Sequence, residues 1–145
     1  RYDANMAQKI AATIKQAGYE HYEVASFGKM RSKHNFGYWE YKKYIGVGAG
    51  AVGFDGQRRL YPHKKIEDYI KNPFFADTEE LSIDDMRAEK ILLGLRSAIG
   101  VPKNLLTNNK ETVGWLVENG VISEVDDKII CNDFFVADEV AARLL

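Results

Sequence analysis

The densest group of side chains able to do chemistry is the run His34-Asn35-Phe36-Gly37-Tyr38-Trp39. A histidine can bind a metal or carry a proton near neutral pH, and aromatic rings beside it can stack on a flat ligand. A lone histidine is more often structural than catalytic. The run by itself therefore indicates a candidate ligand site and leaves the ligand open.

A positively charged, aromatic segment surrounds this run. Residues 29–65 contain nine lysines and arginines against Glu40 and Asp55, a net charge of 9 − 2 = +7. The aromatic residues of the segment are Phe36, Tyr38, Trp39, Tyr41, Tyr44, Phe54 and Tyr61. Two planar anions suit this pattern: single-stranded nucleic acid, whose bases stack, and a tetrapyrrole, whose carboxylates pair with Arg or Lys. The alternative is that the lysines are solvated and the rings are core.

The remaining motifs are weaker. The glycines at 46, 48, 50 and 53 do not open a helix after a strand, as a dinucleotide-binding loop does. We expect instead a buried strand over Ile45–Gly56, with glycines that allow close backbone approach. The three histidines are far apart in the sequence. The single cysteine, Cys131, excludes an internal disulfide and an all-cysteine metal site within the chain.

The elements that must position these residues can be read from periodicity. In the first half we expect a helix over Asp3–Ala17 stopped by Gly18, a strand over Tyr19–Phe27 and a short helix over Lys64–Asn72. Pro73 ends that short helix, because the residue before a proline disfavours the helical region.

The second half reads as a separate unit. Its expected elements are helices over 83–98 and 109–119, strands over 121–125 and 128–131, and a last helix capped by Asp133. Ser82 and Asp85 form a capping-box pattern before the first of these helices. Two helices, a two-stranded wing and a helix indicate a winged-helix-like arrangement.

Composition and charge limit the function classes. The 145 residues are 46% hydrophobic and 28% charged with a net charge of −1, and no run approaches the ~20 apolar residues of a membrane helix. Residues 1–80 carry 13 − 10 = +3, and residues 81–145 carry 7 − 11 = −4. A DNA-binding protein neutralises several phosphates with a basic face, and residues 81–145 are net negative. We therefore expect the winged-helix-like unit to be a packing or lid module.

Several motifs together resemble a known family. The form HNxxYW of residues 34–39, the strand Tyr19–Val24, and the segment Tyr44–Arg59 resemble oxygen-independent coproporphyrinogen III oxidase-like proteins, the HemN/HemW group of radical SAM proteins. Leu81 followed by Glu89 and Leu93-Gly94-Leu95-Arg96 resembles the opening of its C-terminal helical domain, and Leu116–Ile122 resembles the segment that follows in that domain. The resemblance runs along nearly the whole chain in the family's order.

The resemblance implies a C-terminal fragment with a mixed α/β fold. Residues 1–72 would be the last strands and helices of an incomplete radical SAM barrel, 73–80 a linker, and 81–145 the winged-helix-like C-terminal domain. The family's [4Fe–4S] cluster and S-adenosylmethionine would belong to the parent chain, because the CxxxCxxC cluster motif is absent here. We therefore expect no catalytic residue in this stretch, no activity of it alone, and a cytoplasmic parent protein.

The resemblance also assigns candidate site residues. His34 is the candidate haem-iron ligand, and the tetrapyrrole-binding candidates are His34, Asn35, Tyr38, Trp39 and Arg59. Gly48, Gly50 and Val52 are candidates to approach S-adenosylmethionine. The expected partner is a tetrapyrrole, either coproporphyrinogen III, which the oxidases decarboxylate, or haem, which the chaperone branch carries. The alternative is a winged-helix-like nucleic-acid-binding module with a basic aromatic arm.

Overall fold

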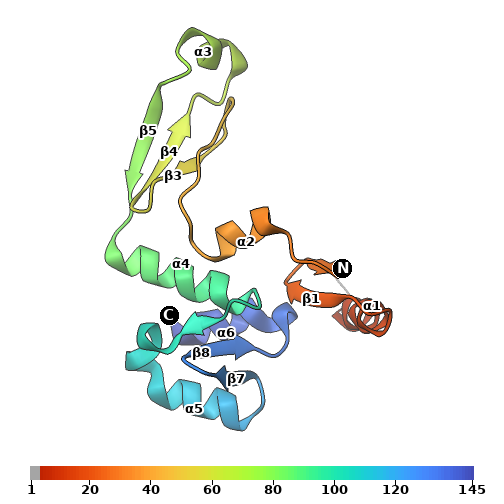
Figure 1. The fold of residues 1–145 in the computed structure, drawn as a ribbon. Helices are drawn as coiled ribbons and strands as arrows, with labels where there is room; N and C mark the ends of the chain where they lie inside the picture. The colour runs from red at the N-terminus through yellow and green to blue at the C-terminus, as the bar shows by residue number, and fades with distance from the viewer. Residues whose placement is uncertain (1–3) are drawn as a thin grey trace.

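The computed structural model describes residues 4–145. The first helix, α1 (Ala4–Gln16), ends where Gly18 adopts a φ of 84°, a left-handed conformation that glycine adopts without strain. The helix expected over Asp3–Ala17 is confirmed over its described part, and Asp3 lies outside the described residues. Figure 1 shows α1 beside the hairpin that follows it.

Residues Tyr19–Phe27 form a hairpin, so the single strand expected there is wrong. β1 (Glu20–Glu23) pairs antiparallel with β2 (Ser26–Gly28). The reversal between them carries no Gly or Pro signal in the sequence. It is held from outside, because the amide of Val24 donates to the carbonyl of Arg96 at 2.9 Å.

The HNxxYW run forms a short helix that periodicity did not predict. α2 (Lys33–Trp39) begins at Ser32, whose hydroxyl accepts a hydrogen bond from the amide of Asn35 at 3.3 Å. A serine at this position satisfies one of the free N–H groups at the start of a helix. The cap therefore fixes where the helix begins and which side chains share a face.

The middle of the chain forms a three-stranded antiparallel arm of order β3-β4-β5. Its elements are β3 (Gly53–Phe54), β4 (Arg58–Pro62), α3 (Ile66–Lys71) and β5 (Ala76–Glu80). Figure 1 shows this arm projecting away from the C-terminal half, with α3 at its far end. The helix expected near Lys64–Asn72 is confirmed as α3.

Two expectations about the arm differ from the structure. The buried strand expected over Ile45–Gly56 is wrong, because only β3 is strand and Ile45 is 90% exposed. The expected linker 73–80 contains β5, which pairs with β4 through five residue pairs. The pairing of β4 with β5 joins residues 14 to 22 positions apart, which the local pattern does not contain. The domain boundaries at 72 and 81 themselves stay a prediction.

The C-terminal half begins with α4 (Ile83–Leu95), and both hydrogen bonds of the expected Ser82–Asp85 capping box are present. The elements that follow are β6 (Val101–Pro102), η1 (Lys103–Asn109), α5 (Lys110–Glu118), β7 (Ile122–Val125), β8 (Lys128–Cys131), η2 (Phe134–Val136) and α6 (Ala137–Leu144). The expected hairpin is confirmed as β7 and β8, and β6 joins β8 to give the order β6-β8-β7. Asp133 caps η2, which leads into α6.

The hydrophobic core lies in this C-terminal half. Thirteen buried residues between Ile91 and Leu144 form one cluster, and Ile91, Leu95 and Leu144 have no exposed surface. Burying a side chain of this size contributes about 1.5–3 kcal/mol. Within the arm, by contrast, Phe54 is the large apolar side chain that the described residues bury fully. The C-terminal half therefore provides the rigid support, and the arm depends on contacts with it.

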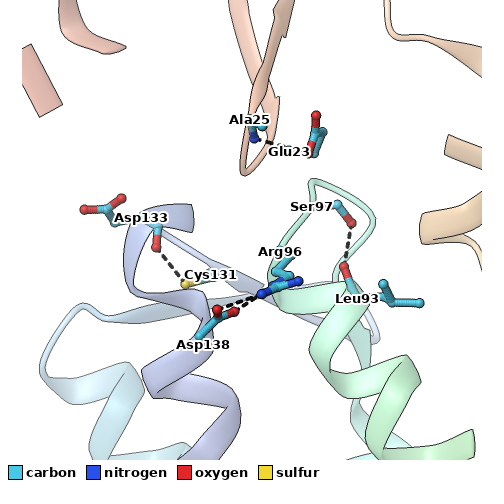
Figure 2. A network of polar contacts seen from close by, with 8 residues as sticks. All are labelled: Glu23, Ala25, Leu93, Arg96, Ser97, Cys131, Asp133 and Asp138. Carbon is cyan, nitrogen blue, oxygen red and sulfur yellow. Dashed lines mark hydrogen bonds and ion pairs between the residues drawn. The ribbon is translucent and has the colours of Figure 1, made fainter. Parts of the chain in front are cut away.

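The β1–β2 hairpin docks on the end of α4. Glu23, 3% exposed, forms a bridge with Ser97, and its carboxylate accepts from the amide of Ala25 at 3.2 Å. Figure 2 shows Glu23 and Ala25 above Ser97 and the end of α4, where the guanidinium of Arg96 makes a bidentate contact with Asp138 at 2.6 and 2.7 Å. The hairpin is thus tied to the end of α4, which Arg96 in turn joins to α6.

The fold is a mixture of helices and short sheets, as the sequence predicted. Every strand pairing among residues 4–145 is antiparallel, so this stretch shows none of the parallel pairs of an α/β barrel. Within the same residues, no helix is long and apolar enough to cross a membrane.

Candidate functional site

The helix α2 presents its histidine to solvent. His34 is exposed, and its ring meets the ring of Tyr38 in an edge-on contact with centroids 5.0 Å apart. The two residues are four apart, a spacing that places side chains on the same helix face. The imidazole is therefore oriented by a neighbouring ring and open to an incoming ligand.

Gly37 leaves space beside this histidine. It lies three residues after His34 on the same face, and a Cβ built on it would meet nothing within 4 Å. Glycine is unfavourable inside a helix by about 1 kcal/mol relative to alanine. Packing within the described chain therefore does not explain this glycine, and the surface next to the imidazole is flat and open.

Aromatic rings connect the helix to a cavity on the arm. Tyr38 contacts Tyr44 edge-on at 4.8 Å, and Tyr44 lies 6.0 Å from Phe54. Tyr44 and Phe54 line a cavity of about 880 Å³ whose other walls come from the glycine loop, β4 and the segment after α3. Ligand pockets span roughly 300–1,000 Å³, so this cavity can take a large flat molecule.

The glycine loop, residues 46–52, is pinned to the arm. The amide of Gly48 donates to the hydroxyl of Tyr69 at 3.2 Å, and the amide of Gly50 donates to the carbonyl of His63 at 2.9 Å. A Cβ at Gly46 would collide with the backbone of Ala51. The expected close backbone approach is thus found at Gly46, in a loop where a strand was expected.

Arg59 is held inside the protein. Its guanidinium lies 2.6 Å from the carboxylate of Glu89 on α4, and both side chains are about three-quarters buried. The hydroxyl of Tyr41 donates to the same carboxylate at 2.5 Å. Burial, together with this hydrogen bond, raises the pKa of Tyr41 well above its usual range. We call Tyr41, Arg59 and Glu89 the clamp, because they join the arm to α4.

The structure brings together some of the predicted site residues. His34, Asn35, Tyr38 and Trp39 share α2, although Trp39 turns away and lines a different, smaller cavity together with residues of the C-terminal half. The indole N–H of Trp39 is buried, and it has no hydrogen-bond partner within the part of the chain that the structure describes. Gly48, Gly50 and Val52 share the glycine loop on the arm. Arg59 pairs with Glu89, so the carboxylate that it contacts belongs to the chain itself.

The positive charge of residues 29–65 is partly neutralised. All three of its arginines form ion pairs within the chain: Arg31 with Glu20, Arg58 with Asp55, and Arg59 with Glu89. The remaining cations of the segment are lysines. The solvent-facing positive charge is therefore carried by lysines.

The residues present do not form a metal-cluster site. Among residues 4–145 no three His, Cys, Asp or Glu side chains gather in a group able to hold a metal ion. The single thiol, Cys131, is buried, and burial raises its pKa. A thiol must be deprotonated to bind a metal, so an iron–sulfur cluster does not fit this stretch of chain. An exposed imidazole such as His34 is a group that could hold haem iron.

Sequence reasoning missed the clamp as a functional feature. Glu89 was noted for its place in the resemblance, and Tyr41 only as one of several rings. Tyr41 adopts a φ of 58°, which is uncommon for a residue other than glycine. The conformation belongs to the turn that ends α2, where the amide of Tyr41 donates to the carbonyl of Tyr38 and the amide of Lys42 donates to the carbonyl of Gly37, both at 3.0 Å. Glycine is the usual residue at this position, so the tyrosine gives no sequence signal, and its hydroxyl contacts a residue 48 positions away.

Comparison with known proteins places the chain. No family model matches it. The heme chaperone HemW of Bacillus subtilis (strain 168) is 34% identical over 108 residues, which cover 70% of this chain and 28% of that protein. HemW of Lactococcus lactis subsp. lactis (strain IL1403) is 32% identical over 140 residues, covering 90% of this chain and 36% of that protein. The chain spans about a third of the length of the curated relatives it matches.

A solved structure shares the fold. Coproporphyrinogen III oxidase (HemN) from Escherichia coli, described as a radical SAM enzyme, matches with a TM-score of 0.66 over 95% of this chain and 39% of that chain, at 12% identity. The arrangement of arm, hairpin and C-terminal half is therefore shared with part of that solved structure. The sequence relatives show the family: the chain belongs to the HemN/HemW family.

Proposed function

We propose that this chain is part of a radical SAM protein of haem or porphyrin metabolism, and that α2 forms its tetrapyrrole contact. The observation that carries the proposal is the exposed imidazole of His34 beside the open surface at Gly37. The relatives named heme chaperone point to haem as the ligand, and the solved structure's name points to coproporphyrinogen III.

Each residue of α2 would have a distinct task. His34 would approach the haem iron, and Tyr38 would hold the imidazole edge-on. The chain of rings through Tyr44 would extend the apolar surface toward the arm cavity, where a flat macrocycle can bury its face. Lysines of residues 29–65 would pair with the propionates, because the clamp already engages Arg59.

The wider architecture follows as a proposal. Residues 1–72 would complete a radical SAM barrel, and 81–145 would form a winged-helix-like domain, supported by the observed order of helix, short strand, two helical segments and a hairpin. The cluster and S-adenosylmethionine would be held largely outside this chain, with the loop at Gly48, Gly50 and Val52 as its contribution. This stretch would then bind and position, and would carry no catalytic residue.

The nucleic-acid alternative is not favoured. The curated relatives are haem chaperones, and ion pairs neutralise Arg31, Arg58 and Arg59. Backbone contacts to phosphates need free cations along one face. A winged-helix-like shape alone does not define a nucleic-acid reader.

The test is a haem titration of the 145-residue chain, followed by the Soret absorption band. We expect His34→Ala to weaken binding at least tenfold and to shift the Soret maximum, because an axial ligand is lost. Gly37→Leu should weaken binding as well, by filling the open surface, without removing a ligand.

Two variants serve as matched controls. His63→Ala removes a histidine that stacks on Phe75 at 4.1 Å and lies on the arm, and Gly114→Leu changes another helix glycine with open surroundings. Both should bind haem like the wild type. Equal haem affinity and an unchanged Soret band for wild type and His34→Ala would refute the proposal.

A further inference from the structure

A second cavity lies in the C-terminal half, away from α2 and the arm. Its volume is about 430 Å³, and its walls come from η1, α5, β7 and β8. The floor is apolar, formed by Leu106, Val113 and Ile129. Leu106 and Ile129 belong to the buried core, so the floor is rigid and the cavity is preformed.

Gly114 keeps one wall of this cavity open. It stands in the middle of α5, yet a Cβ built on it would meet nothing within 4 Å, and its φ is not positive. Glycine is among the least favourable residues inside a helix. Neither the backbone conformation nor the packing within the described chain requires a glycine at position 114. A molecule bound in the cavity would require one, because a side chain there would fill part of the cavity.

The rim of the cavity has unbalanced charge. Lys103 and Glu124 form an ion pair at 2.5 Å across it. Lys110, at the first position of α5, is exposed and has no ion pair among the residues that the structure describes. A bound carboxylate would supply the missing negative charge while the apolar floor takes the body of the molecule.

We propose that this cavity binds a small molecule with a compact apolar body and one carboxylate. The body would lie on Leu106, Val113 and Ile129 against the open wall at Gly114, and the carboxylate would pair with Lys110. Pockets of this volume, mostly apolar with one or two polar groups that fix orientation, are typical of small-molecule sites. The site is separate from the proposed tetrapyrrole contact and does not depend on it.

The test uses 2-naphthoate as the probe, titrated into the ¹⁵N-labelled chain and followed by amide chemical shifts. We expect the amides of Thr107, Gly114 and Ile129 to shift in a saturable manner. The uncharged 2-naphthamide should bind at least fivefold more weakly, and acetate, which lacks the apolar body, should cause no saturable shift. Lys110→Glu should weaken 2-naphthoate binding about tenfold.

Gly114→Leu should abolish these shifts by filling the cavity. Gly37→Leu is the matched control, because it places the same side chain on another open helix glycine, and it should bind 2-naphthoate like the wild type. If Gly114→Leu loses its fold, the Lys110→Glu and 2-naphthamide comparisons decide the question. Shifts confined to the arm, or equal binding of naphthoate and naphthamide, would overturn the proposal.

Discussion

The clamp between the arm and α4 allows a quantitative prediction. Glu89→Gln keeps the shape of the side chain but removes its charge, leaving Arg59 as a cation whose side chain is only 27% exposed. Exposed ion pairs contribute about 0–1 kcal/mol, and breaking a buried pair costs about 3–5 kcal/mol. Both partners are about three-quarters buried, so we expect the free energy that holds the arm on α4 to fall by about 2 kcal/mol. This corresponds to about a 30-fold change in the equilibrium between the docked and undocked arm.

The assay is urea unfolding followed by the emission of Trp39, which lies on α2 at the junction with the C-terminal half. Trp115 is 52% exposed, so Trp115→Phe removes the second signal with little effect on packing. The transition reported by Trp39 should move to lower urea in Glu89→Gln. A double-mutant cycle with Arg59→Met should give a coupling of about 1–2 kcal/mol.

Glu80→Gln is the matched control for the clamp. Glu80 lies 3.9 Å from Arg58 and its side chain is 75% exposed, so the same chemical change there should leave the midpoint unchanged. An unchanged midpoint in Glu89→Gln, or strictly additive effects of the two clamp substitutions, would refute the reasoning that this pair holds the arm.

Three further predictions concern stability. Burial lowers the pKa of His21, which stacks on Phe27, so the unfolded chain binds the proton more readily than the folded chain. The free energy of unfolding should therefore fall as the pH drops below about 6.5. Urea midpoints measured between pH 5.5 and 7.5 should show this dependence in the wild type and a weaker one in His21→Phe. Ser82→Ala removes the capping box and should cost about 1 kcal/mol by thermal unfolding. Gly100→Ala should cost about 3 kcal/mol, because the φ is 73° and the Cβ would lie 2.8 Å from the carbonyl of Ile129; a midpoint like that of the wild type would contradict it.

The pH prediction takes its sign from the groups around His21. Desolvation is the largest influence and lowers the pKa, and Lys15 acts in the same direction; a hydrogen bond with the backbone of Val24, followed by Asp133 and Glu23, acts against it. Its Nε2 is buried and has no hydrogen-bond partner among residues 4–145. A proton added there would create a charge enclosed by aromatic rings, which explains why the folded state resists protonation.

Much of the candidate site was accessible from sequence. The HNxxYW run identifies the residue types, whereas the helix that places His34 and Tyr38 on one face, and the contact between their rings, came only from the structure. The role of Arg59 toward a ligand was not accessible, because its partner Glu89 is thirty positions away and belongs to a different element. Sequence patterns identify residue types, whereas ion-pair partners depend on how elements pack.

The sequence by itself determined the local features of this protein: the helix caps at Ser82 and Asp133, the hairpin of β7 and β8, and the HNxxYW run. Each depends on interactions between residues a few positions apart, so the pattern contains all the partners. Only the tertiary structure decided the reversal at residues 23–26, which contacts Arg96 and Ser97, and the pairing of β4 with β5, whose partners are 14 to 22 positions apart. Tertiary contacts override local preference there because the hydrogen bonds and buried area that they supply exceed the small energies of propensity.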